Sequence, residues 1–214
     1  MKKLIATLVI VVLIATCQIA LSNEVRALGW KDLVPSDLSA DDLFNGLNEE
    51  QRSTVSWSIN WFNNLPERNS ETEEIFEIYE KTIAELEEAG IDINEIIKKQ
   101  KKLHTSVVKE LNGQKVSIPG YLLPLEMTGS SVTEFLLVPY IGACILAPPP
   151  RPNQIVHVTI DGKKGYKSKT LFDPVLVTGV ILIESLVKDL YLVDGSSNIS
   201  IGYIMKATKI KSYK

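Results

Sequence analysis

The chain has 214 residues, of which 45% are hydrophobic, so it can bury a core of ordinary size and is not disordered throughout. Its formal net charge is −3 and it has no clear basic-aromatic platform, which argues against a nucleic-acid-binding protein. Residues 23–103 carry 9 basic and 18 acidic side chains, whereas residues 104–214 carry 12 basic and 8 acidic ones. The two parts therefore have opposite charge and are expected to be distinct segments.

The first residues have the pattern of an export signal. A basic start at Lys2 and Lys3 precedes an apolar run over residues 4–15, and small residues end the stretch at Ser22. We expect a signal peptide over residues 1–22 and an exported protein, periplasmic or associated with the cell envelope. Two alternatives stay open: a lipidated Cys17, or an uncleaved anchor, since a run of about 18 apolar residues can just span a bilayer. Either would attach the protein to a membrane through its N-terminal segment.

Residues 23–106 are predicted to be a helical N-terminal segment. A turn-rich lead-in over 28–47 precedes a helix over 49–64 and a second helix that begins near Ser70 and stops at Gly90. A further short helix then starts after Asp92, which with Glu95 resembles a capping box. The apolar stripes expected to face the core are Val55, Ile59 and Phe62 in the first helix and Phe76, Tyr79, Ile83 and Leu86 in the second.

Residues 107–214 are predicted to form a small, mainly antiparallel β-structure, so the fold class is α+β. Short apolar runs separated by turn residues are typical of a small barrel or sandwich, with a bulge or sharp bend expected at Gly179. Several runs are almost continuously apolar, which favours strands covered on both faces. The predicted strands are 114–119, 121–127, 133–139, 154–160, 175–184 and 200–210.

A rigid segment, GACILAPPPRPNQ, separates two of these strands at residues 142–154. Consecutive prolines favour an extended polyproline II strap, and the polar residues after it can satisfy backbone groups before the next strand begins. The same strap could present an already ordered binding patch, because rigidity lowers the entropy cost of association. The candidate surface consists of Tyr140, Cys144, Ile145, Leu146, Pro148, Pro149, Pro150, Arg151, Asn153 and Gln154.

No catalytic pattern stands out, so we predict a protein that is not an enzyme and has no cofactor. The sequence has two histidines and lacks both a G-x-S-x-G elbow and a phosphate-binding glycine loop. We interpret Cys144 as a small buried apolar residue and His157 as a half-exposed strand residue. The alternative is a zinc or copper site formed by Cys144 with His157 and Glu126. A hydrolase would require a pocket that no spacing here predicts.

Several longer motifs carry a resemblance to a known family. They are LGWKDLVP, LNGQKVSIPGYLLPLE, TEFLLVPYIGACILAPPPRPNQIVHV, VTGVILIE and IGYIMKA. Together they resemble DUF3299, an uncharacterised family of exported bacterial proteins. The resemblance implies an OB-like β-barrel behind a signal sequence, no enzymatic activity, and in some members a gene near transport components. Related sequences generally have a histidine two residues after the cysteine, where this chain has Leu146, and this weakens a Cys-x-His metal site.

The sequence therefore predicts three regions: a signal peptide over 1–22, a helical segment over 23–106 and an OB-like β-barrel over 107–214. We expect a non-catalytic, exported cell-envelope binding or accessory module. By resemblance, its partner would be a membrane transport component or another envelope protein. The alternative function is a periplasmic metal-handling protein that uses Cys144.

Overall fold

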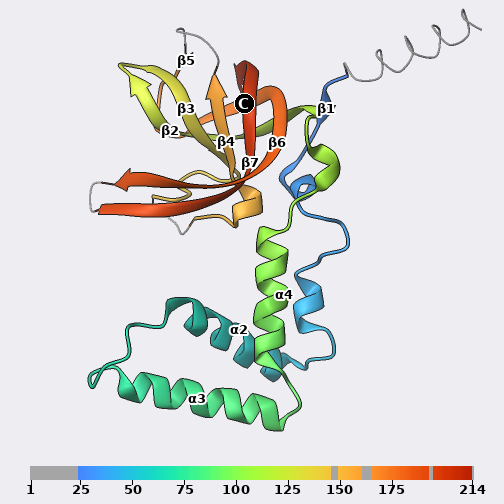
Figure 1. Ribbon diagram of the computed structural model, residues 1–214, viewed down its shortest axis with the longest axis vertical. Coiled ribbons are helices and arrows are strands. Elements are labelled where there is room, and N and C mark those ends of the chain that lie inside the picture. The colour runs from blue at the N-terminus through green and yellow to red at the C-terminus, as the bar shows by residue number, and fades with distance from the viewer. Residues whose placement is uncertain (1–23, 146–148, 161–164, 193–194, 214) are drawn as a thin grey trace, which may run out of the picture. The chain divides into compact units, whose positions relative to one another are not determined.

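The computed structural model describes residues 24–145, 149–160, 165–192 and 195–213, and its fold class is α+β, as predicted (Figure 1). The chain divides into two compact units. We call Ser36–His104 the helical unit, and Met1–Pro35 with Thr105–Lys214 the sheet unit. Among the described residues, no helix combines the length and the apolar character needed to cross a membrane.

The helical unit confirms the predicted helices. They are α2 (Glu49–Asn64), α3 (Glu73–Glu88) and α4 (Ile93–Thr105), preceded by the 3₁₀ turn η2 (Asp41–Phe44). Local signals set these bounds. Asn48 and Gln51 form a reciprocal capping box at the start of α2, and Gly90, with φ of +77°, follows the end of α3. The Asp92 carboxylate accepts a hydrogen bond from the Glu95 amide, as the predicted cap requires.

The core of the helical unit is thinner than the apolar stripes predict. Val55 and Ile59 of α2 are buried as expected, but Phe62, one turn further on, is 48% exposed. In α3 only Leu86 is buried, and the other stripe residues are half-buried. α2 and α3 pack against each other, but part of their apolar surface stays open to solvent.

The sheet unit is a seven-stranded mixed sheet. The pairings run β1-β2-β6-β7-β4-β3-β5, and an additional β2–β3 pairing returns the order to β2, so the sheet curls into a partial ring. Neighbours are antiparallel except for β1–β2 and β4–β7. The strands are β1 (Arg26–Ala27), β2 (Lys115–Thr128), β3 (Ser131–Val138), β4 (Val156–Ile160), β5 (Tyr166–Lys167), β6 (Asp173–Leu192) and β7 (Gly195–Ser212).

The strand predictions were correct in place but not in length. The two runs predicted at 114–119 and 121–127 form the single strand β2, which passes through Pro119 and Gly120. β6 and β7 both extend beyond their predicted ends and pair as a long hairpin arm. The register shift expected at Gly179 is present, and a Cβ there would collide with the Lys206 carbonyl oxygen.

Residues 24–35 belong to the sheet unit rather than to the helical segment in which the sequence places them. β1 pairs in parallel with β2, and the Leu28 amide donates a hydrogen bond to the Ser117 carbonyl at 2.9 Å. Leu28 and Leu33 are buried in the main core together with large side chains such as Phe135. The apolar residues of this lead-in therefore close one side of the curled sheet.

Three buried or half-buried polar side chains hold the separate segments of the sheet unit together, and we call them the polar tie: Tyr203, Asn153 and Gln154. The Tyr203 hydroxyl donates to the Leu33 carbonyl at 2.8 Å and accepts from the Val108 amide at 2.7 Å. Asn153 donates to the Ser106 carbonyl, and Gln154 donates to the Trp30 carbonyl, each at 2.9 Å. Residues 30–33, 106–108 and 153–154 are thereby bound to one another and to β7.

Candidate functional site

An apolar groove of about 410 Å³ lies at one end of the sheet unit. Five separate segments supply its walls: the 3₁₀ turn η1 (Trp30–Leu33), β2, the residue after β3, β6 and the residue after β7. Aromatic rings and prolines form most of the lining, a composition suited to stacking against an apolar or extended ligand. The lining residues are Trp30, Pro119, Gly120, Tyr121, Pro139, Pro174 and Tyr213.

Gly120 allows Trp30 to lie directly on strand β2. A Cβ at position 120 would lie 2.8 Å from Cζ2 of Trp30 and 2.8 Å from the Val138 carbonyl oxygen. Any larger residue there would displace the indole or the neighbouring strand. The backbone of Trp30 is held separately, because its carbonyl accepts the Gln154 hydrogen bond of the polar tie.

The groove wall at Pro174 directly follows a buried carboxylate, Asp173. This buried carboxylate accepts hydrogen bonds from the Lys169 and Thr170 amides and from the Thr170 hydroxyl. Burial alone would raise the pKa of Asp173, but these hydrogen bonds outweigh it and lower the pKa below its ordinary value. The next residue, Pro174, lines the groove, and its carbonyl accepts from the Tyr213 amide at 2.9 Å.

An exposed apolar loop begins beside the groove. Pro139 lines the groove, and the residues after it carry Tyr140, Ile141 and Ile145 on the surface, with Ile141 65% exposed. A turn fixes the loop, since Gly142 has a φ of +82° and its carbonyl accepts from the Ile145 amide at 3.2 Å. The groove and the loop over residues 139–145 therefore share Pro139 and form adjoining surfaces.

The side chain of Cys144 points into the core beneath this loop and is not exposed on its surface. Its side chain is buried with Leu123, Leu136 and Ile155, which agrees with its interpretation as a small apolar residue. Burial raises the pKa of the Cys144 thiol to about 11, so thiolate is scarce at neutral pH. Its φ of +68° is unusual for a residue other than glycine and adds backbone strain to the turn.

The proline segment divides into surface residues and anchoring residues. Leu146 and Pro148 lie outside the described residues. Pro149 and Arg151 are exposed and Pro150 is half-buried, and Arg151 has the φ of −58° and ψ of 148° of polyproline II. Asn153 is buried and Gln154 half-buried in the 3₁₀ turn η4 (Pro152–Gln154), where both take part in the polar tie. Of the candidate surface residues that the structure describes, Cys144 and Asn153 are thus buried.

His157 is buried, with 7% of its surface exposed, and its interpretation as a half-exposed residue was wrong. Its Nε2 lies 2.7 Å from Oε1 of Glu134, which the Lys188 ammonium also contacts at 2.7 Å. Lys188 belongs to the long arm of β6, so a segment distant in the sequence supplies part of this cluster. Burial would raise the pKa of Glu134, but the hydrogen bonds from Lys188 and His157 lower it overall.

The structure does not assemble the alternative metal site. Among the residues that it describes, which include Cys144, His157 and Glu126, no group of three or more histidine, cysteine or acidic side chains could hold a metal ion. His157 is instead engaged with Glu134, and Glu126 lies exposed near the tip of the β2–β3 hairpin.

Sequence reasoning missed the groove, although five of its seven lining residues stand in the motifs quoted above. Trp30 lies in LGWKDLVP, Pro119 to Tyr121 in SIPGY, and Pro139 in LVPY. Each of these motifs supplies a proline or an aromatic residue to the lining of the groove. Only the fold shows that these separate motifs line one groove.

Comparison with known proteins agrees with the motifs. The family model described as "Protein of unknown function (DUF3299)" matches residues 30–212. The chain belongs to the DUF3299 family. A crystal structure of a DUF3299 family protein from Pseudomonas aeruginosa PAO1 is similar over 90% of this chain and 98% of that one, with 27% sequence identity and a TM-score of 0.47. No curated protein matches the chain. In this member of DUF3299 the family match includes every residue that lines the groove except Tyr213.

The Asp173 carboxylate gives a pH-dependent prediction. We expect Asp173→Asn to lower the free energy of unfolding at pH 7 by about 1–3 kcal/mol, because an amide cannot accept all the hydrogen bonds that reach the carboxylate. A lowered folded-state pKa stabilises the fold above the unfolded-state pKa, and this contribution disappears as pH falls through the folded-state value. The difference in the free energy of unfolding between wild type and variant should therefore shrink as the pH falls below 3.8, the ordinary pKa of an aspartate. Urea denaturation at several pH values measures it, with exposed Asp189→Asn as the control. A difference that stays constant into acid would contradict this role.

The burial of Cys144 predicts a slow thiol. At a pH near neutrality, we expect iodoacetamide to alkylate Cys144 at least about tenfold more slowly in the folded protein than in the protein unfolded by urea. The reason is that burial disfavours the thiolate. Mass spectrometry of the peptide that contains Cys144 measures the rate separately from Cys17. Equal rates in the folded and unfolded chain would show that the thiol is accessible and would revive the metal alternative.

Proposed function

We propose that this protein is a non-catalytic binding or accessory module of the cell envelope. The groove together with the loop over residues 139–145 is its recognition surface. The observation that carries the proposal is the shared Pro139, which joins an aromatic and proline-lined groove to an exposed apolar loop. The partner is an envelope protein or a membrane transport component that presents an extended apolar segment.

The chemistry of the groove favours binding over catalysis. Tryptophan, tyrosine, proline and glycine supply stacking surface and shape, and grooves of this composition recognise extended, proline-bearing segments. The surface is also restrained before any partner arrives, because Gln154 holds Trp30 and the Gly142 turn holds the loop. Such preorganisation lowers the entropy cost of association.

Two further parts of the proposal concern fold and location. We infer that the partial ring β2-β6-β7-β4-β3 is an OB-like barrel, and the β2–β3 pairing supports this inference. We infer export from the basic and apolar residues 1–22, which lie outside the described residues. An exported binding module needs no cofactor, and the proposal includes none.

Photo-crosslinking in living cells tests the surface. A photoreactive amino acid in place of Ile145 is expected to capture one specific envelope protein, identified by mass spectrometry. The matched probe replaces Met127, which is also exposed and apolar but lies near the opposite end of the β2–β3 hairpin. Adding Tyr213→Ala should reduce the Ile145 adduct about tenfold, because an aromatic anchor of an interface contributes about 1–2 kcal/mol.

The exposed variant Val187→Ala, on the long arm of β6, should leave the Ile145 adduct unchanged. If Ile145 and Met127 capture the same set of proteins, the loop is not a specific surface. An Ile145 adduct that is insensitive to Tyr213→Ala would separate the loop from the groove and contradict their joint role.

A further inference from the structure

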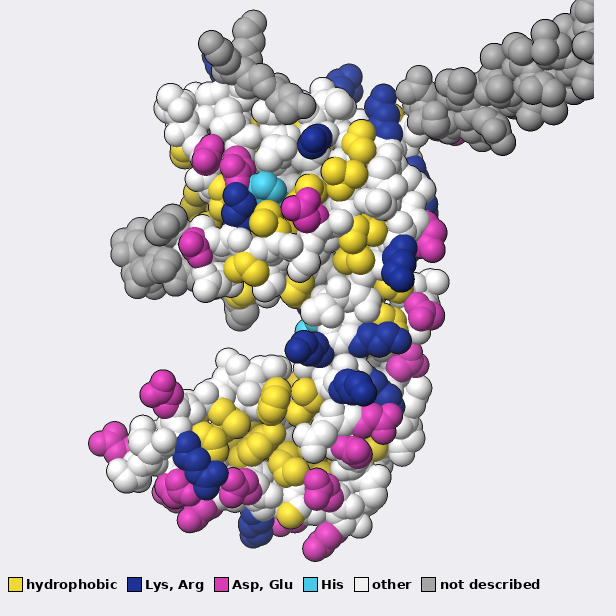
Figure 2. Space-filling view, in the orientation of Figure 1, with side chains coloured by type: hydrophobic (Ala, Val, Ile, Leu, Met, Phe, Trp, Pro, Cys, Tyr) yellow, Lys and Arg dark blue, Asp and Glu magenta, His cyan; other side chains and the backbone are white. Residues whose placement is uncertain are grey.

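The helical unit carries a second apolar surface, which we call the aromatic face: Trp57, Trp61, Phe62, Phe76 and Tyr79. The Trp57 and Trp61 rings are 4.3 Å apart, and Trp61 stacks on Tyr79 of α3 with 6.4 Å between centroids. Four of these five side chains are half-buried, and Phe62 is exposed. Figure 2 shows hydrophobic side chains gathered over the helical unit, with acidic side chains along the edge of the same face.

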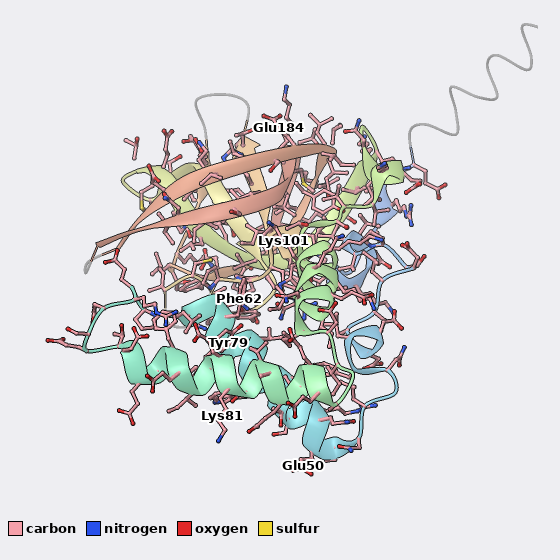
Figure 3. All side chains as sticks on the ribbon, turned by 60° about the horizontal axis from the view of Figure 1, so that its bottom comes forward. Glu50, Phe62, Tyr79, Lys81, Lys101 and Glu184 are labelled. Carbon is pink, nitrogen blue, oxygen red and sulfur yellow. The ribbon has the colours of Figure 1, made fainter. Side chains whose placement is uncertain are left out.

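The aromatic face lies on the surface of the helical unit and is not part of its buried core. In Figure 3, Phe62 and Tyr79 lie toward the side of the helix pair from which Lys81 points away. Soluble proteins place isolated apolar residues on the surface, but five partly exposed aromatic residues on one helix pair, three of them in ring contact, are typical of an interaction site. Aromatic side chains are also the residue type most enriched at binding hot spots.

The charge around this face is strongly negative. Residues 49–90 contain eleven acidic and three basic side chains. One of the basic residues, Arg68, already contacts Glu73 at 2.6 Å and Glu80 at 2.7 Å, and it lies 5.0 Å from the Phe76 ring centroid. Another, Lys81, lies 3.9 Å from Glu85. The acidic surplus of α2 and α3 is therefore compensated only in part by their own basic side chains.

We propose that the aromatic face binds a basic amphipathic helix of a partner protein. Apolar side chains of such a helix fit the partly open stripe between α2 and α3, and its lysines and arginines complement the surrounding glutamates. Basic groups over Trp57 or Trp61 would add cation–π attraction. This proposal rests on the helical unit alone and does not depend on the surface proposed for the sheet unit.

Two other occupants fit the same observations less well. An anionic lipid surface would be repelled by the acidic surplus. A second copy of this chain has a basic run in α4, at Lys98 to Lys102, but Ile93, Ile96 and Leu103 of that helix are already buried and Ile97 is half-buried. α4 therefore cannot offer an exposed apolar stripe beside its basic residues.

The test uses the purified full chain and a dye-labelled synthetic helix of leucine and lysine, about four turns long, with leucines at amphipathic spacing. Fluorescence anisotropy should show binding, and a twin peptide with glutamate in place of lysine should bind at least about tenfold more weakly. Phe62→Ser should weaken binding of the lysine peptide about fivefold to tenfold, since it removes one aromatic anchor. The matched control is Leu171→Ser, an equally exposed apolar residue of the sheet unit, which should not change the affinity.

Circular dichroism and urea denaturation establish that both variants remain folded, and a photoreactive group on the lysine peptide maps its site. Adducts within residues 57–79 support the proposal. Equal binding of the two peptides, equal effects of Phe62→Ser and Leu171→Ser, or adducts within residues 105–214 would each overturn it. So would a photoreactive probe at Phe62 that reacts only with a second copy of the chain or with the chain's own sheet unit.

Discussion

The Tyr203 hydroxyl holds together the part of the structure on which the proposed recognition surface depends. It is fully buried on β7, donates to Leu33 and accepts from Val108. Burial raises the pKa of this phenol, although the hydrogen bond from Val108 acts in the opposite direction, so the hydroxyl stays protonated and can donate. A buried hydroxyl without hydrogen-bond partners would cost free energy of folding. Here both partners are backbone groups that lie outside the β-strands, the Leu33 carbonyl and the Val108 amide.

The groove follows from this arrangement. Leu33 ends the short turn that begins at Trp30, and Gln154 holds the Trp30 carbonyl from the other side. The indole can then lie on β2 only because position 120 is glycine. The described end of the proline segment therefore has at least one structural role: Asn153 and Gln154 satisfy the Ser106 and Trp30 carbonyls. Its exposed residues remain available for recognition in the proposed function.

Local patterns predicted the elements, and nonlocal contacts decided what the sequence could not show. The capping box at Asn48 and the helix end at Gly90 depend only on residues close by in the sequence, so the bounds of α2 and α3 could be predicted. The separation of β2 into two strands was wrong because Pro119 and Gly120 usually interrupt a strand, whereas here both pair with β6. The burial of His157 depends on Lys188 and Glu134, and no spacing near residue 157 indicates that partnership.

The candidate site shows the same limit. Sequence reasoning found the proline segment and named the exposed Tyr140 and Ile145. Its interpretation of Cys144 as a small buried residue, and of the polar residues after the prolines as partners of backbone groups, is confirmed, so Cys144 and Asn153 do not belong to the exposed candidate surface. The groove could not be predicted because five segments from Trp30 to Tyr213 meet only in the folded sheet. The aromatic face was hidden for the opposite reason. Phe62, Phe76 and Tyr79 stand in stripes that the sequence assigns to the core, and only the exposure of Phe62 and the half-burial of the other two distinguish them from core residues.

The most direct test of this account is the stability of Tyr203→Phe together with amide hydrogen exchange at Val108. We predict a loss of about 1–3 kcal/mol in the free energy of unfolding, because the Leu33 carbonyl and the Val108 amide both lose a buried partner. Exchange at Val108 should accelerate more than exchange in the β2–β6 ladder. The matched control Tyr166→Phe, at a half-buried tyrosine of β5, should stay within about 0.5 kcal/mol of wild type. If Tyr203→Phe is as stable as wild type and Val108 remains equally protected, the polar tie does not hold the recognition surface in place.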